Sequence, residues 1–153
     1  MGHEDFMREA LALARANLAA GGRPFGALLV REGQVLARAA NGIHRHHDPT
    51  AHAELLAIRA ASTALRSARL DGAVMYASGH PCPMCLAAMH LCGIAEAWFA
   101  YSNEEAEPHG LSTARIYAEM ALPPARQERL RLRSLRPPGE HGLYGEWDAR
   151  RPA

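Results

Sequence analysis

Two short motifs contain the residues whose types and spacing are able to do chemistry. His52 and Glu54 stand two residues apart, and Cys82 and Cys85 form a Cys-x-x-Cys pair within the run Pro-Cys-Pro-Met-Cys. Histidine nitrogen and cysteine sulfur are preferred zinc ligands, and a catalytic zinc keeps one position open for water, whereas a structural zinc is closed by four protein ligands. Three ligands beside one carboxylate therefore predict an open, catalytic zinc site in which Glu54 moves protons.

Each half of this predicted site falls at the start of an expected helix. Asp48-Pro49-Thr50 is a helix-start signal, so we expect a helix over about 51–65 with the histidine and the glutamate in its first turn. A second helix is expected over about 83–92, ending at Gly93. The N-terminus of a helix exposes unpaired N–H groups and a partial positive charge, which favours thiolates. Residues three apart share a helix face, so both sulfurs can point at one metal.

Two other interpretations of the cysteines compete with the open zinc site. In the first, Cys92 is a fourth ligand and the zinc is structural. If the segment is helical, the rise of ~1.5 Å per residue places Cys92 roughly 10 Å beyond Cys85, too far for a zinc–sulfur bond of ~2.3 Å. We therefore predict that Cys92 is a buried thiol. In the second, the Cys-x-x-Cys is a redox pair, which leaves His52 and Glu54 without a role.

The remaining elements are expected from hydrophobic periodicity and from turn residues. Helices are expected over 4–19, 112–120 and 142–150, and strands over 25–31, 34–40, 73–78, 95–101 and 129–135. This alternation predicts an α/β protein with helices on both faces of a five-stranded sheet.

Length, composition and charge limit the class of protein. The 153 residues, 48% hydrophobic and 22% charged, fit one soluble domain over 1–153, and we expect no membrane contact, no signal peptide and a cytoplasmic location. All 17 basic residues are arginines, and the formal net charge is only +1. Because nucleic-acid enzymes usually carry a basic surface, a nucleic-acid partner is not expected. Arginines do gather at 126–136, where the alternation at 129–133 favours a solvated strand face over a polyanion contact.

Together these motifs resemble those of the cytidine deaminase superfamily, and within it the chain is most similar to small bacterial guanine deaminases. The resemblance covers nearly the whole chain and is carried by Gly22–Ala27, Asp48–Glu54 and Pro81–Cys85. It implies a three-layer α/β/α fold around a mixed five-stranded sheet and one Zn²⁺ per subunit. The implied reaction is hydrolytic deamination of a nucleobase or related amino-heterocycle, guanine-like, with release of ammonia. Glu54 would carry a proton from the zinc-activated water to the ring nitrogen and then to the departing ammonia.

The resemblance also implies which residues contact the substrate. Phe25 would stack on the base, Asn41 would hydrogen-bond to it, and the backbone of Ala53 would add a further contact. The residues themselves leave simpler alternatives open. These are core packing for Phe25 and a turn for Asn41-Gly42.

A further implication concerns assembly. In guanine deaminases the C-terminal segment crosses to a second subunit and helps to close its site, so the resemblance implies a homodimer that exchanges residues 137–153. Glu140 or His141 would then reach the partner's pocket. The alternative is a solvated tail.

Two positions depart from the guanine deaminase pattern and leave the substrate open. His80 stands where similar sequences have Glu, and it is either a pocket contact or a residue outside the pocket. Ser112-Thr113 stand where guanine deaminases carry an acidic pair that helps to read the base, and a buried donor without an acceptor costs on the order of 1–3 kcal/mol. Two other functions therefore stay open: deamination of tRNA adenosine or of a nucleoside, and a non-catalytic zinc- or nucleotide-binding module.

Overall fold

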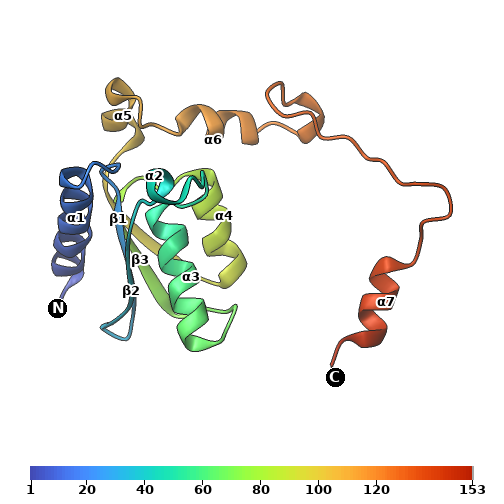
Figure 1. The fold of residues 1–153 in the computed structure, drawn as a ribbon, viewed down its shortest axis with the longest axis horizontal. Coiled ribbons are helices and arrows are strands. Elements are labelled where there is room, and N and C mark those ends of the chain that lie inside the picture. Colours follow the sequence, from blue (N-terminus) through green and yellow to red (C-terminus); the bar gives the residue numbers. More distant parts are fainter. Residues whose placement is uncertain (153) are drawn as a thin grey trace.

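The computed structural model describes residues 1–152, which surround and extend from a mixed sheet covered by helices on both faces (Figure 1). The elements are α1 (His3–Ala19), β1 (Gly26–Arg31), β2 (Gln34–Ala40), α2 (Ile43–His46), α3 (Ala53–Leu65), β3 (Ala73–Gly79), α4 (Pro83–Cys92), β4 (Glu96–Tyr101), α5 (Asn103–Ala106), η1 (Glu107–His109), α6 (Ala114–Met120), η2 (Pro124–Arg126) and α7 (Leu143–Arg150). None of the helices described in 1–152 is both long and apolar enough to cross a bilayer.

The sheet has the strand order β2-β1-β3-β4. β1 is antiparallel to both β2 and β3, whereas β3 and β4 are parallel. The β1–β2 hairpin turns at Glu32 and Gly33, which both have positive φ, as a tight two-residue hairpin turn requires. A parallel pair needs a crossover connection, and α4 supplies it between β3 and β4. This crossover brings the Cys-x-x-Cys pair to the end of the sheet.

Successive residues of the central strands face opposite helical layers. Leu28 of β1 packs with Phe6 and Ala10 of α1, whereas Leu29 packs in a second cluster with Met75 and the α3 and α4 side chains. Figure 1 shows α1 on one face of the sheet and α3 with α4 on the other. Strands that are buried on both faces read as continuous apolar runs, and β1 does so. This packing holds the N-terminal ends of α3 and α4 in place.

The predicted fifth strand over 129–135 is wrong, because the sheet described within residues 1–152 has four strands. The segment runs away from the sheet toward α7 (Figure 1), and Leu130, Leu132 and Leu135 are 67%, 71% and 91% exposed. Alternating leucines and arginines favour a strand only where a sheet edge pairs with them, and in its own chain this segment meets none. All six residues of β4 are exposed, so β4 is left as the edge of the sheet. We call residues 127–152 the C-terminal arm.

Candidate active site

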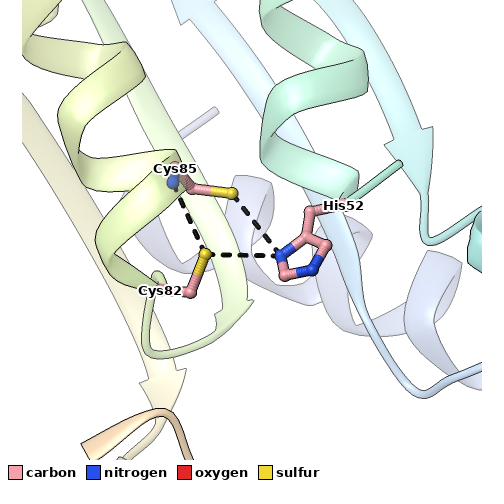
Figure 2. Close-up of side chains that lie close together, drawn as sticks. All are labelled: His52, Cys82 and Cys85. Carbon is pink, nitrogen blue, oxygen red and sulfur yellow. Dashed lines mark hydrogen bonds between the residues drawn. The ribbon is translucent and has the colours of Figure 1, made fainter. Parts of the chain in front are cut away.

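The structure brings His52, Cys82 and Cys85 together where α3 and α4 begin (Figure 2). The Nδ1 atom of His52 lies 3.4 Å from Sγ of Cys82 and 3.7 Å from Sγ of Cys85. Tetrahedral zinc with bonds of ~2.3 Å to sulfur and ~2.0 Å to nitrogen places sulfur and nitrogen ligands about 3.6 Å apart. The donor set and its spacing therefore fit zinc, as predicted from the sequence.

Helix-capping chemistry places the ligands. Cys82 is the N-cap of α4, and its sulfur accepts a hydrogen bond from the backbone N–H of Cys85, 3.4 Å away. Pro83 follows at a position where its missing N–H costs no hydrogen bond. His52 is the N-cap of α3, which begins at Ala53 and not at the predicted 51. Asp48 instead stabilises a turn by accepting from the backbone N–H of Thr50, so the prediction that it caps this helix is wrong.

The competing structural zinc site is not formed. Among the described residues the potential ligand group contains His52, Cys82 and Cys85 alone. Cys92 is buried, and its thiol donates to the carbonyl oxygen of Met89. The prediction of a buried, non-ligating thiol is therefore confirmed, and the metal site keeps an open position.

Glu54 lies in the first turn of α3, is only 8% exposed, and places Oε2 3.7 Å from Sγ of Cys85. Burial raises the pKa of the Glu54 carboxyl. A carboxyl group whose pKa is raised toward neutrality is suited both to accept and to return a proton. The carboxylate thus lies buried beside the three ligands.

Of the two cysteines, Cys85 holds its proton more strongly than Cys82 does. Hydrogen bonds from the Cys85 thiol, from His52 and from the Cys85 backbone lower the pKa of Cys82 to about 4. The pKa of Cys85 is raised because its thiol donates to the Cys82 sulfur and because it is buried. The hydrogen bond to Cys82 also raises the pKa of His52. Cys82 is therefore stabilised as the thiolate, the form that binds metal, whereas Cys85 keeps its proton.

A small pocket of about 60 Å³ lies over these groups, and Phe25, Asn41, His80 and Thr113 help to line it. The Oδ1 atom of Asn41 accepts from the backbone N–H of Ile43 at 3.1 Å, which stabilises a turn. The same residue also lines the pocket. The amide Nδ2 of Asn41 is thus the group left to donate to a ligand. Of the other predicted contacts, Ala53 is fully buried at the start of α3.

Asn17 of α1 holds the segments around the pocket together, and the sequence prediction missed it. Its Nδ2 donates to the carbonyl oxygens of Arg23 and Asn41, at 2.7 and 3.0 Å, and its Oδ1 accepts from Arg45 at 2.8 Å. The side chain is 4% exposed. The one available signal was an asparagine on the apolar face of α1, in register with Ala10 and Ala14.

His80 is held by contacts with aromatic rings and with a buried asparagine. Its ring lies 4.7 Å from that of Phe99 and 5.4 Å from that of Tyr117, measured between centroids. The buried Asn103 contacts His80 Nδ1 at 3.3 Å and accepts from the backbone N–H of Thr113 at 3.1 Å. Asn103 was also missed, although it lies only two residues beyond the end of β4. His80 therefore lines the pocket and also packs against the rings of Phe99 and Tyr117.

The predicted tail contacts are not brought to this pocket by their own chain. Glu140 and His141 are exposed, and both line a separate hollow formed by residues 134–145 of the arm. Figure 1 shows the arm ending in α7, away from the sheet. Any role for these two residues thus depends on a second copy.

Comparisons with known proteins agree with this geometry. The family model of the cytidine and deoxycytidylate deaminase zinc-binding region matches residues 1–101. The guanine deaminase of Bacillus subtilis (strain 168) is 39% identical over 124 residues, 80% of each chain. A tRNA-specific adenosine deaminase of Aquifex aeolicus is 39% identical over 100 residues, 65% of this chain and 66% of that one. The X-ray structure of Bacillus subtilis guanine deaminase has a TM-score of 0.90 at 33% identity, covering 97% of this chain and 95% of that one.

Proposed function

Because the chain belongs to the cytidine and deoxycytidylate deaminase family, we propose that it is a zinc-dependent aminohydrolase that deaminates a nucleobase or related amino-heterocycle and releases ammonia. The observation that carries this proposal is the buried Glu54 carboxylate beside three zinc-type ligands that leave a fourth position open. Zinc held by His52, Cys82 and Cys85 would supply a Lewis acid that activates a water molecule at neutral pH.

The residues around the ligands have separate roles in this proposal. Glu54 accepts one proton from the attacking water and delivers it to the ring nitrogen. It then takes the remaining proton of the added hydroxyl group and gives it to the amine, which leaves as ammonia as the C–N bond breaks. The Asn41 amide donates to an acceptor on the ring, and Phe25 packs against the ring face. Gly79 leaves space for Phe25, since a Cβ at Gly79 would lie 3.0 Å from the Phe25 ring.

The test is ammonia release by zinc-loaded protein from guanine, adenine, cytosine, guanosine, cytidine, pterins and triazines, with Glu54→Ala protein beside it. Turnover of one compound by the parent and none by the variant supports the proposal. Turnover restricted to an adenosine in a tRNA anticodon stem-loop would assign the other activity found among the relatives. Equal release by parent and variant, or zinc binding without turnover of any of these compounds, contradicts the proposal.

We further propose that the working unit is a homodimer in which each C-terminal arm packs on the other copy. The arm exposes leucines in strand alternation, and β4 offers an unpaired edge on which Trp98 and Phe99 are each 45% exposed. When an extended segment pairs with an edge strand, each supplies hydrogen-bond partners for the unpaired N–H and C=O groups of the other. Glu140 and His141 would then approach the partner's pocket. A cytoplasmic location, which keeps the three thiols reduced, belongs to the same proposal.

A further inference from the structure

A second and larger cavity of about 230 Å³ lies beside the small pocket. Its walls include apolar side chains of α1 and α5: Leu11, Ala14, Leu18 and Ala106. Phe25, His80 and Leu111 line both cavities, so the two spaces meet at these three side chains. A molecule bound over the metal ligands therefore has the larger cavity directly beside it.

The inner polar groups of the larger cavity are already engaged by the protein. Ser78 Oγ accepts from the backbone N–H of Gly26 at 3.0 Å, and Asn103 Oδ1 accepts from Thr113. Glu105, which is exposed at the rim, accepts from the backbone N–H of Ser102 at 2.8 Å. A sugar hydroxyl or a phosphate placed there would give up hydrogen bonds to water without full replacement, whereas an apolar group would gain by leaving water.

The remaining charged groups of this cavity stand at its surface. Arg15 and His109 contribute to the lining, and both residues are exposed to solvent. They surround an apolar interior, and exposed charges contribute little binding energy for a phosphate in water. The chemistry of the interior therefore favours an alkyl or aromatic group over a sugar phosphate.

From this arrangement, and resting on the proposed function, we infer that the substrate is an amino-heterocycle bearing an apolar substituent. The ring occupies the small pocket between Phe25, Asn41 and Glu54. The substituent passes Phe25, His80 and Leu111 and fills the larger cavity. A free base held over the ligands would leave the larger cavity, of about 230 Å³, to water.

The test compares free bases with their benzyl derivatives: adenine with 9-benzyladenine, guanine with 9-benzylguanine, and cytosine with 1-benzylcytosine. For the ring that is deaminated, we expect kcat/KM of the benzyl compound to exceed that of the free base by about tenfold or more. Ala106→Phe places a ring in the larger cavity. It should lower kcat/KM for the benzyl compound by about tenfold and leave that for the free base within about twofold. Ala12→Phe, on the exposed face of α1, is the matched control and should change neither.

Each other outcome overturns the inference. Equal kcat/KM for a base and its benzyl derivative shows that the larger cavity holds no substituent. An equal loss on both compounds in Ala106→Phe protein, or a change in its mass by light scattering, shows that the cavity supports folding or seats the second copy. If none of these six compounds is deaminated, the wider ammonia-release panel decides the proposed function, and calorimetric titration of zinc-loaded Glu54→Gln protein decides the cavity by itself. Tighter binding of the benzyl compounds supports the inference, and equal or no binding overturns it.

Discussion

The Glu54 side chain occupies a site from which water is largely excluded, yet it lies beside groups that hold charge. Desolvation alone favours its neutral form, and the same residue must ionise to accept a proton. Replacing this carboxyl group by an amide changes its ability to hold a proton far more than it changes its shape. The side chain's chemistry can therefore be separated from its packing by one substitution.

Glu54→Gln is expected to bind zinc as the parent does and to lose about 10²- to 10⁴-fold in kcat, the usual contribution of a general acid–base. The amide keeps the volume and one hydrogen-bonding oxygen but cannot carry the proton. Ammonia release measures the loss, and elemental analysis measures the zinc. Residual turnover within tenfold of the parent would refute the proton-shuttle role.

Asn17→Ala should raise KM and lower the free energy of unfolding by about 1–3 kcal/mol, because the carbonyl oxygens of Arg23 and Asn41 lose a buried donor. Urea unfolding and steady-state kinetics report the two effects. The control is Arg8→Ala on the exposed side of α1, whose ion pairs with Glu4 and Asp5 are solvated, and it should change stability by at most about 0.5 kcal/mol. An unchanged KM in Asn17→Ala protein would remove Asn17 from the organisation of the pocket.

At the scale of the elements, α1 lies against β1 at Gly26 with no room for a side chain. A Cβ at Gly26 would lie 2.7 Å from the backbone nitrogen of Ala14 and would clash with the carbonyl oxygen of Ala10. The same residue donates its N–H to Ser78. The helix is thereby fixed close to the segment that leads to Phe25.

Gly26→Ala is therefore expected to destabilise the protein by about 1–3 kcal/mol, since α1 must shift away from the sheet. The matched control is Gly145→Ala in α7, where an added Cβ meets no atom within 4 Å, and which should be neutral or stabilising by up to about 1 kcal/mol. Thermal and urea unfolding compare the two. Equal stability of both variants would contradict the close contact of α1 with β1.

The sequence alone was sufficient to predict those parts of the site whose geometry depends on residues close together in the chain. His52 and the Cys82–Cys85 pair could be recognised because their spacing along two helix starts already fixes how they meet. Asn17 and Asn103 could not be recognised, since their partners are backbone groups that only the folded chain brings near. The strand expected over 129–135 failed for a related reason: alternation specifies a strand's faces but not which edge it pairs with. The four observed strands were each predicted to within one residue at either end, because apolar runs and flanking turn residues mark them.

At the scale of the whole molecule, the C-terminal arm runs away from the sheet of its own chain (Figure 1). Leu130→Asp/Leu132→Asp protein should be monomeric by light scattering and the parent should be dimeric, since the substitutions place charge on the apolar face that pairs in the proposed dimer. Arg129→Asp/Arg131→Asp, on the opposite face of the same segment, is the control and should stay dimeric. A monomeric parent, or a dimer that survives the leucine substitutions, would refute the exchange of arms.

The exposed β4 edge also affects how readily the protein aggregates. Its sequence Glu-Ala-Trp-Phe-Ala-Tyr is aromatic, carries a single charge, and contains neither the lysine nor the proline that protects many strand edges. An unpaired edge of this kind is a template for any extended polypeptide. Whatever segment pairs with β4 therefore also protects it from other polypeptides. In the proposed dimer, cutting one arm with a protease would expose the β4 edge of the other copy and make that dimer a seed for aggregation.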